Sequence, residues 1–389
     1  MSTDWRPLEA AAARKPAWPA KSPFTSDLAS LRTLIWAAGF GWSVLFIAIG
    51  IAYELQLYGD GSIFSYAIAT GETWAFHWHN ISNRLFVHVL THIPAEAYVK
   101  LSGDVGGAIA LYGLLFFAAP LMGLAATYAA DRSDGRLILT FACLSTACLM
   151  PLVFGCPTEM WIAHSAFWPA VAIAHYARRG ALGAAVVLLS LLALAFSHEA
   201  GLVLAASILA PLILRGPASL ASLRAAAAFL VVLGMWSAVR VLLPPDAYFG
   251  AIIGRAASLF FDVAALAQNP MLVLVAAVTA YLVLAAAFHR VTLGRAHLPA
   301  IVVVTAGLAV FWLWFDGSIH AENRYTFRTA VFLATGLLGL LAGLLATSAC
   351  QPCECSAPCP PGLAHLQALI ARYAEGALAR VQTPSRTAA

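Results

Sequence analysis

The sequence predicts an all-α protein that crosses a lipid bilayer many times. Of its 389 residues, 61% are hydrophobic and only 10% are charged, whereas an ordinary soluble domain carries about 25% charged residues. Several apolar runs reach the roughly 17 to 25 residues that cross about 30 Å of hydrocarbon as a helix. A helix also satisfies its backbone hydrogen bonds internally, as an open chain in lipid requires.

Ten apolar runs are candidates for membrane-spanning helices, and we expect them to form one polytopic bundle. They cover residues 31–52, 105–129, 137–154, 161–177, 181–197, 200–214, 225–243, 270–288, 298–315 and 329–347. The fifth and sixth runs are separated only around the short stretch SHEA, so these two could instead form one re-entrant hairpin.

The order of these runs predicts three parts of the chain. Residues 1–30 form a cytoplasmic N-terminal tail, residues 31–347 form the transmembrane domain, and residues 348–389 form a cytoplasmic cysteine-rich segment with an amphipathic helix. Within the transmembrane domain, residues 53–104 are a long first outer loop. The tail does not resemble a cleavable signal peptide, so we expect the first span to stay in the mature protein.

The distribution of basic residues predicts the orientation. Of the 22 Lys and Arg residues, sixteen fall on one side of the spans when the N-terminus is placed inside. The other side holds Arg84, Lys100, Arg255, Arg324 and Arg328. This positive-inside pattern predicts cytoplasmic termini, in a bacterial-type inner (plasma) membrane with the active face outward. The net charge of +4 gives no support to nucleic-acid binding.

Most of the remaining polar side chains fall on the outer side, so we expect any chemistry there. The inner connections are short basic turns, and the chain has neither a GxxxxGK[ST] loop nor a GxGxxG motif, so coupling to ATP within it is not expected. The outer loop opens with YELQLYGDGSIFSYAIATGETW, which contains the carboxylates Glu54, Asp60 and Glu72. Glycines on both sides of Asp60 predict a tight turn that leaves its carboxylate accessible.

The second half of this loop, SNRLFVHVLTHIPAEAYVKL, predicts an amphipathic helix. Apolar residues such as Leu85, Val89 and Ile93 recur at helical spacing, and Pro94 is expected to end the helix. We expect the helix to lie along the membrane surface.

Further polar residues mark the outer ends of later spans. They are Glu159, His198, Glu199, Arg324, Tyr325 and Arg328. A charge at membrane depth costs a few kcal/mol unless it is paired or lines an aqueous cavity, so Glu199 indicates either a structural ion pair or a functional site. Arg324 and Arg328 are one helical turn apart and would present two cations suited to phosphate, although anchoring at the membrane interface explains them as well.

This arrangement resembles the GT-C class of integral membrane glycosyltransferases. The likeness is carried by YGDGSIFSYAIATG with SNRLF after it, by the SHEAG tip, and by ENRYTFR at the last span. As a topology it covers residues 31–347. The resemblance implies a sugar donor carried on a polyprenyl phosphate, a glycan, lipid or protein acceptor, and a site at the outer membrane face. Many members carry two nearby acids in the first loop, whereas Asp60 has only Gly59 and Gly61 beside it.

By position, the resemblance implies that Asp60 is the base that activates the acceptor, with Glu54 and Glu72 as alternatives. The substrate-binding residues that it implies are Arg324, Arg328, Tyr325, His198, Glu199, Glu159 and Arg84. Of these, Arg324 or Arg328 would hold the lipid-linked phosphate, because fixed cations stabilise the charge that develops on a leaving phosphate. No cofactor follows with certainty, and a divalent metal stays an open alternative.

Two rival functions stay open beside the transferase. The first is an outer zinc or copper site, because His77, His79, His88 and His92 offer four imidazoles within a short stretch and an i, i+4 pair can ligate one ion. The second is a multi-span transporter, because proline-interrupted spans could be the broken helices of a carrier.

The C-terminal segment contains a second candidate metal site. Its four cysteines are Cys350, Cys353, Cys355 and Cys359. Four thiols suffice in number for zinc or an iron–sulfur cluster, and acylated or unstructured cysteines are the alternatives. The amphipathic helix that follows is expected to bind the inner membrane surface or a partner.

Overall fold

The computed structural model describes residues 24–75, 84–153, 158–177, 180–215, 219–268 and 324–346, with a few isolated positions between 272 and 280. Every element in these ranges is helical and none is a strand, which confirms the predicted all-α class. The longer helices are α1 (Phe24–Ala52), α2 (Asp60–Thr70), α5 (Ile93–Ser102), α6 (Val105–Ala130), α7 (Leu137–Cys148), α8 (Met160–Tyr176), α9 (Ala181–Ala195), α10 (Gly201–Arg215), α11 (Leu220–Leu242), α12 (Ala247–Phe260) and α16 (Arg324–Ala346). The short ones are η2 (Leu55–Leu57), α4 (Leu85–Val87), η4 (His88–His92), η5 (Asp134–Arg136), η6 (Met150–Val153) and α13 (Val263–Ala267).

The helices agree with the predicted spans wherever the two can be compared. Eight of the ten runs coincide with α1, α6, α7, α8, α9, α10, α11 and α16. Four helical stretches, Ser30–Ala52, Val105–Ala130, Leu220–Leu242 and Thr329–Ala346, have the length and composition to cross a membrane, whereas the apolar helices α7, α9 and α10 are shorter. The protein is therefore a membrane protein by composition. The runs at 270–288 and 298–315 lie almost wholly outside the described residues, so the count of ten spans stays a prediction.

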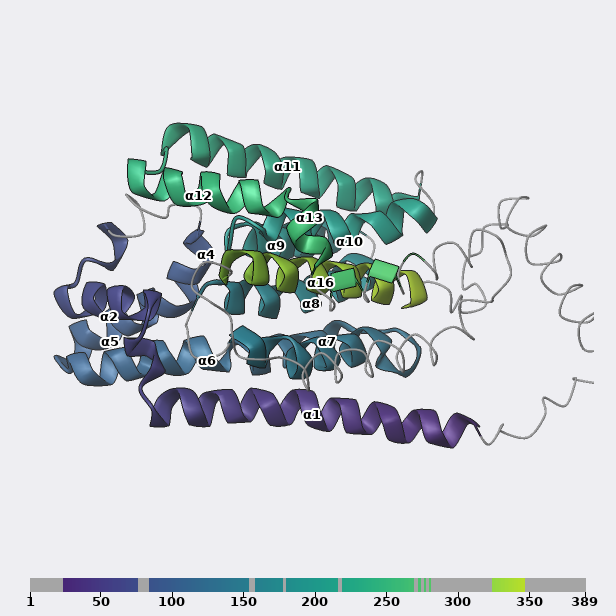
Figure 1. The fold of residues 1–389 in the computed structure, drawn as a ribbon, viewed down its shortest axis with the longest axis horizontal. Helices are drawn as coiled ribbons and strands as arrows, with labels where there is room; N and C mark the ends of the chain where they lie inside the picture. The colour runs from purple at the N-terminus through teal and green to yellow at the C-terminus, as the bar shows by residue number, and fades with distance from the viewer. Residues whose placement is uncertain are drawn as a thin grey trace, which may run out of the picture.

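Consecutive long helices run in alternating directions through the bundle. In Figure 1, α1 lies along one side, α11 and α12 lie along the other, and α7, α8, α9, α10 and α16 lie between them. One end, which we call the loop end, carries α2, α4, α5 and the connection from α9 to α10. The opposite end carries the start of α1 and the connection from α6 to α7, where Arg32 Nη1 donates to the carbonyl oxygen of Gly135 at 3.2 Å.

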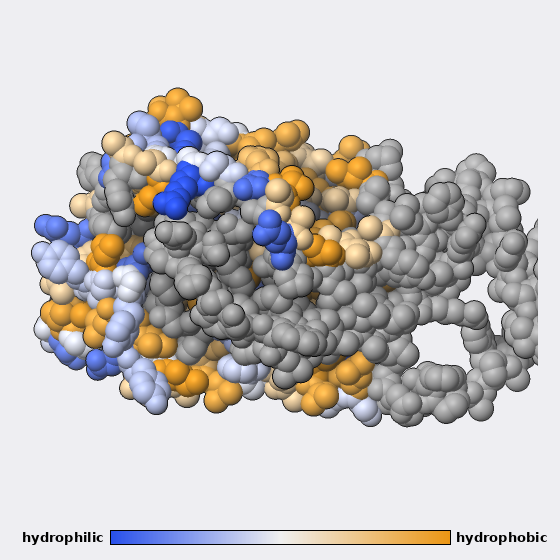
Figure 2. Space-filling model, in the orientation of Figure 1, coloured by the Kyte–Doolittle hydropathy of each residue, from blue (hydrophilic) through white to orange (hydrophobic). Residues whose placement is uncertain are grey.

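The surface of the bundle is largely apolar along its flanks. Figure 2 shows hydrophilic and hydrophobic residues mixed at the loop end and mainly hydrophobic residues along the edges formed by α1 and α11. Exposed apolar side chains on these flanks include Leu34 and Val44 of α1 and Leu230 of α11. Because apolar surface of this extent is stable next to lipid, the flanks suit a bilayer environment.

Helices pack closely where glycine removes the side chain from the interface. A Cβ atom on Gly39 of α1 would lie 2.6 Å from the Cα atom of Cys143 in α7, so the two backbones touch there. Gly123 of α6 lies against the backbone of Ser165 in α8 in the same way. Small residues that let backbones approach are typical of helix pairs in membranes, where packing rather than hydrophobicity drives association.

The first outer loop agrees with its prediction at Asp60 and differs from it at Pro94. Asp60 is exposed in a tight turn, where the backbone N–H of Gly61 donates to the carbonyl oxygen of Tyr58 at 3.1 Å. It is also the first residue of α2, which begins after Gly59 (φ 57°) and is followed by Gly71 (φ 71°). Pro94 does not end the helix of the second half, because it lies in the first turn of α5, where no backbone donor is needed. A π-helical turn, η4, joins α4 to α5 instead.

The helical segment from Leu85 to Ile93 is amphipathic, with one exposed side and one buried side. Leu85, Val89 and Ile93 are exposed, whereas His88 and His92 are buried against the bundle. The apolar stripe thus faces outward and the histidine stripe faces the protein. This arrangement suits a helix that lies at a lipid boundary.

Candidate functional site

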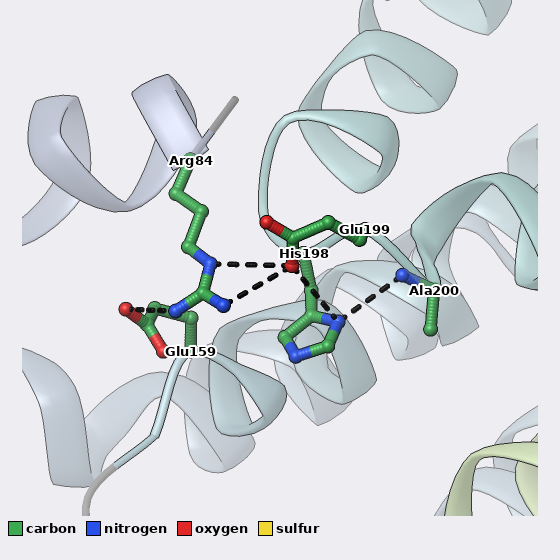
Figure 3. Close-up of polar contacts among 5 residues, drawn as sticks. All are labelled: Arg84, Glu159, His198, Glu199 and Ala200. Carbon is green, nitrogen blue, oxygen red and sulfur yellow. Dashed lines mark hydrogen bonds and ion pairs between the residues drawn. The ribbon is translucent and has the colours of Figure 1, made fainter. Parts of the chain in front are cut away.

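Arg84 lies between two glutamates at the loop end and links three segments that are distant in sequence. It directly precedes α4, whereas Glu159 precedes α8 and Glu199 lies in the connection from α9 to α10. Arg84 Nη1 lies 2.6 Å from Glu159 Oε1, and Arg84 Nη2 lies 3.1 Å from Glu199 Oε2. Arg84 Nε also donates to Glu199 Oε2 at 3.3 Å. Figure 3 shows the guanidinium lying between the two carboxylates. We call Arg84, Glu159 and Glu199 the charged triad.

The charged triad is largely removed from solvent. The side chains of Arg84, Glu159 and Glu199 keep only 13%, 2% and 19% of their exposure. Burial by itself would raise the pKa of Glu199, but the charge of Arg84 outweighs this effect and lowers that pKa to about 2. Burial likewise would lower the pKa of Arg84, and the charges of Glu159 and Glu199 raise it above its usual range. Arg84 and Glu199 are therefore ionised at neutral pH.

Two aromatic rings complete the surroundings of the triad. Phe249 of α12 lies under the guanidinium of Arg84, with 5.2 Å between the Cζ atom and the ring centroid. Phe332 of α16 packs on the imidazole of His198 at 4.8 Å between ring centroids. Next to Arg84, the backbone N–H of Phe86 donates to the carbonyl oxygen of Phe196 at 3.0 Å. The first outer loop is thus fixed to the tip between α9 and α10.

His198 belongs to this site, and its hydrogen bonds define its tautomer. The backbone N–H of Ala200 donates to His198 Nδ1 at 3.1 Å, so Nδ1 is an acceptor and carries no proton. Glu199 Oε2 lies 3.7 Å from the same nitrogen, which is a contact without a shared proton. The Nδ1 atom of His198 therefore lies between the Ala200 backbone N–H and the Glu199 carboxylate (Figure 3).

The triad keeps an unused acceptor. Glu199 Oε1 is buried and accepts no hydrogen bond from the residues that the structure describes. The two carboxylates also exceed the single guanidinium by one negative charge. A buried acceptor without a donor costs about 1 to 3 kcal/mol, so the site favours a ligand that brings hydroxyl or ammonium donors.

The three candidate bases lie at the same end but outside the triad. Asp60 is exposed at the start of α2, Glu54 is exposed with a left-handed backbone (φ 51°), and Glu72 is exposed after α2. Of the three, Asp60 lies on a helix that packs on the bundle, because Phe64 of α2 lies against buried Tyr112 of α6.

Tyr112 joins this region to the bundle and was not predicted from the sequence. Its ring lies 6.3 Å from that of Phe64, which is one turn beyond Asp60 in α2, and 5.2 Å from that of His92. Its hydroxyl is buried and has no hydrogen-bond partner among the described residues. A tyrosine inside an apolar run is a signal that could have identified it, because a phenol buried in a span normally needs a partner.

The predicted histidine metal site is partly within the described residues. His88 and His92 stack with 5.6 Å between ring centroids, and both are buried. Burial, reinforced by His88, lowers the pKa of His92 to about 3, so this imidazole is neutral. Where the structure describes the chain, no group of three or more His, Cys, Asp or Glu residues could hold a metal ion. His77, His79 and the cysteines Cys350, Cys353, Cys355 and Cys359 lie outside the described residues, so both metal predictions stay predictions.

The predicted phosphate-binding arginines lie on α16, of which the structure gives the backbone. The helix begins at Arg324, so Arg324, Tyr325 and Arg328 occupy its first two turns. Phe332, which contacts His198, follows Arg328 by four residues, or about 6 Å along the helix axis. At the far end of α16, the carbonyl oxygen of Ala346 accepts from the Tyr176 hydroxyl at 3.4 Å. The start of α16 therefore belongs to the loop end.

The sequence identified the members of the triad but not their pairing. The resemblance implied that each of the three binds substrate. In the structure, Arg84 pairs with both Glu159 and Glu199. The rule that a charge at membrane depth needs a partner indicated Glu199, but it could not name Arg84, 115 residues earlier, as that partner. Compared with known proteins, the chain matches no family model, no curated protein and no solved structure.

Proposed function

We propose that this protein is an integral membrane glycosyltransferase that uses a polyprenyl-phosphate-linked sugar at the loop end. The observation that carries the proposal is the position of Asp60. Its exposed carboxylate stands at the start of α2, and Phe64 of the same helix packs against buried Tyr112 of α6 at 6.3 Å between ring centroids. A base for this reaction needs solvent or substrate access on one side and a helix packed on the bundle on the other, and the position of Asp60 supports both.

The proposed reaction is a single displacement at the anomeric carbon. Asp60 takes the proton of an acceptor hydroxyl, the oxygen attacks the anomeric carbon, and the bond from that carbon to the phosphate oxygen breaks. The polyprenyl phosphate leaves with the bonding electrons, and the sugar configuration is inverted. Arg324 and Arg328 stabilise the charge on the leaving phosphate, as fixed cations do in such steps. Transfer of the proton to a well-placed base contributes about 10²- to 10⁴-fold to such rates.

The charged triad supports the choice of a sugar as ligand. Glu199 Oε1 is a buried acceptor to which none of the described residues donates, and sugar hydroxyls are donors of the required kind. The exposed apolar flanks of the bundle give an isoprenoid tail a lipid environment beside the site. In this proposal Arg84 holds Glu159 and Glu199 in place, His198 borders the sugar, and the active face of the bundle is the outer face of the plasma membrane.

The proposal is tested by transfer assays with the full chain in liposomes. The donor is a radiolabelled polyprenyl-phosphate hexose, and the acceptor is a total extract of membrane glycolipids. We expect label to appear in the acceptor fraction while polyprenyl phosphate is released. Asp60→Asn should lower the rate by at least about 100-fold, with unchanged yield of folded protein.

The matched control is Asp262→Asn, which removes an exposed carboxylate between α12 and α13 and should leave transfer unchanged. Full activity of Asp60→Asn would exclude Asp60 as the base, and the same assay with Glu54→Gln and Glu72→Gln would then locate it. Absence of transfer with a panel of hexose donors, combined with counterflow of a free solute, would overturn the transferase in favour of a transporter.

A further inference from the structure

The connection between α6 and α7, at the end opposite the loop end, is a rigid turn held by a buried aspartate. Asp131 is fully buried; its Oδ1 accepts from the backbone N–H and hydroxyl of Ser133, and its Oδ2 accepts from the backbone N–H of Leu139. Ser133 Oγ in turn accepts from the backbone N–H of Leu137 at 2.7 Å. The acid and the first N–H groups of α7 are thus satisfied by each other.

Three arginines surround this turn and have few acceptors of their own. Arg32 donates through Nη1 to the carbonyl oxygen of Gly135, and Arg136 donates through Nη1 to the carbonyl oxygens of Tyr128 and Asp131. For the other guanidinium nitrogens, the described residues supply no acceptor. Arg132 is exposed and has no polar partner in the described part of the chain. We call Arg32, Arg132 and Arg136 the arginine turn.

Two of these guanidinium groups are held in place by aromatic rings. Arg32 lies over Trp36 at 5.6 Å from Cζ to the ring centroid, and Arg136 lies over Tyr128 at 4.6 Å. Tyr128 keeps 50% of its exposure. Trp36 is partly buried. Tyrosine and tryptophan next to arginine are typical of the headgroup region of a bilayer.

The length of α1 places the arginine turn at that depth. From Arg32 to the end of α1 at Ala52 the helix runs 20 residues, or about 30 Å, which equals the thickness of the hydrocarbon layer. Exposed Tyr53 follows directly at the other boundary. A span of this length would place the arginines at the depth of the lipid phosphates.

The backbone of the turn is specialised for this arrangement. Gly135 (φ 60°) and Arg136 (φ 55°) are both in the left-handed region, which is costly for a residue with a side chain. A Cβ atom on Gly135 would collide with Arg32 Nη1. The glycine thus admits the Arg32 guanidinium, and the strained backbone of Arg136 directs its side chain onto Tyr128.

From these observations we infer that the arginine turn binds the phosphodiester headgroup of an anionic phospholipid in the membrane leaflet at this end of the bundle. The three arginines exceed the two acids of the turn, Asp131 and Asp134, by one charge, which matches one phosphodiester. Unused guanidinium donors bind phosphate oxygens through charge-assisted hydrogen bonds. Each arginine near an anionic membrane surface contributes about 1 kcal/mol, or about a fivefold change in affinity.

The test uses the full chain, purified in a neutral detergent and titrated with phosphatidylglycerol or phosphatidylcholine. Native mass spectrometry counts the lipids retained, and the thermal midpoint reports stabilisation by bound lipid. We expect phosphatidylglycerol, but not phosphatidylcholine, to be retained and to raise the midpoint. Arg132→Gln and Arg32→Gln should each weaken retention about fivefold, and higher salt should weaken it further.

Two variants separate lipid binding from folding. Arg136→Gly keeps a residue that tolerates positive φ and removes the charge, so it should fold and lose lipid. Arg255→Gln, an exposed arginine of α12, is the matched control and should retain lipid like the native chain. Equal retention by Arg132→Gln, Arg32→Gln and the control would overturn the inference. Equal stabilisation by glycerol phosphate or inorganic phosphate would also overturn it, because the ligand would then be a free phosphate.

Discussion

Replacing Arg84 by methionine should destabilise the protein more than most single substitutions. The change removes the guanidinium and leaves the carboxylates of Glu159 and Glu199 buried without their counter-ion. A carboxyl whose pKa falls from 4.5 to about 2 on folding gains about 3 kcal/mol of stability at neutral pH. Breaking a buried ion pair by removing one partner typically costs about 3 to 5 kcal/mol, which agrees with this magnitude. We therefore expect a loss of about 3 to 5 kcal/mol.

The assay is thermal and denaturant unfolding of the purified protein in detergent, followed by tryptophan fluorescence. Arg84→Met should lower the apparent midpoint by several degrees. Adding Glu159→Gln and Glu199→Gln to Arg84→Met should recover more than half of the loss, because no uncompensated charge is then buried. Arg84→Lys keeps the charge but lacks the planar guanidinium group that contacts both glutamates. Its stability should therefore lie between those of the native chain and Arg84→Met. The reasoning is refuted if Arg84→Met melts like the native chain, or if the triple variant is no more stable than Arg84→Met.

Two further predictions concern pH and packing. Because the folded-state pKa of Glu199 is depressed, its contribution to stability is complete above about pH 5 and is lost as the pH falls toward 2. When unfolding is measured at a series of pH values, the stability of Glu199→Gln should fall less steeply with acid than that of the native chain. An unchanged dependence on pH would contradict the pairing with Arg84. Gly39→Ala places a Cβ atom 2.6 Å from the Cα atom of Cys143, so it should cost about 1 to 3 kcal/mol by overpacking. Gly41→Ala is its control, because a Cβ atom on Gly41 would meet no atom of the described residues within 4 Å; equal melting of the two variants would argue against the close approach of α1 and α7.

The fold class and most helix positions were predictable because the length of an apolar run reports directly on a helix that crosses lipid. The exposed face of the segment from Leu85 to Ile93 was harder to assign, since in a membrane protein an apolar stripe can face either lipid or the core. His88 and His92, which face the protein, show that polarity alone does not identify the buried side. Pro94 was misjudged for a local reason, because proline ends a helix only when it lies beyond the first turn.

The candidate site was predictable residue by residue but not as an arrangement. Charges near the outer ends of spans were correctly suspected of needing partners, yet three chain segments had to fold together before Arg84, Glu159 and Glu199 could meet. Phe249 gives no signal in the sequence that distinguishes it from other aromatic residues. Its role follows from Arg84, whose guanidinium lies over its ring in the fold.

The wide separation of the triad along the chain has a consequence for biosynthesis. Arg84 leaves the ribosome 115 residues before Glu199, which at 5 to 20 residues per second is a delay of about 6 to 23 seconds. Glu159 follows Arg84 after 75 residues, so for the first part of that interval the arginine has neither carboxylate, and for the rest it has one. Completion of the charged triad must therefore be a late step of membrane insertion. In a chain arrested before the connection from α9 to α10, the segment around Arg84 should be more open to protease than in the full chain.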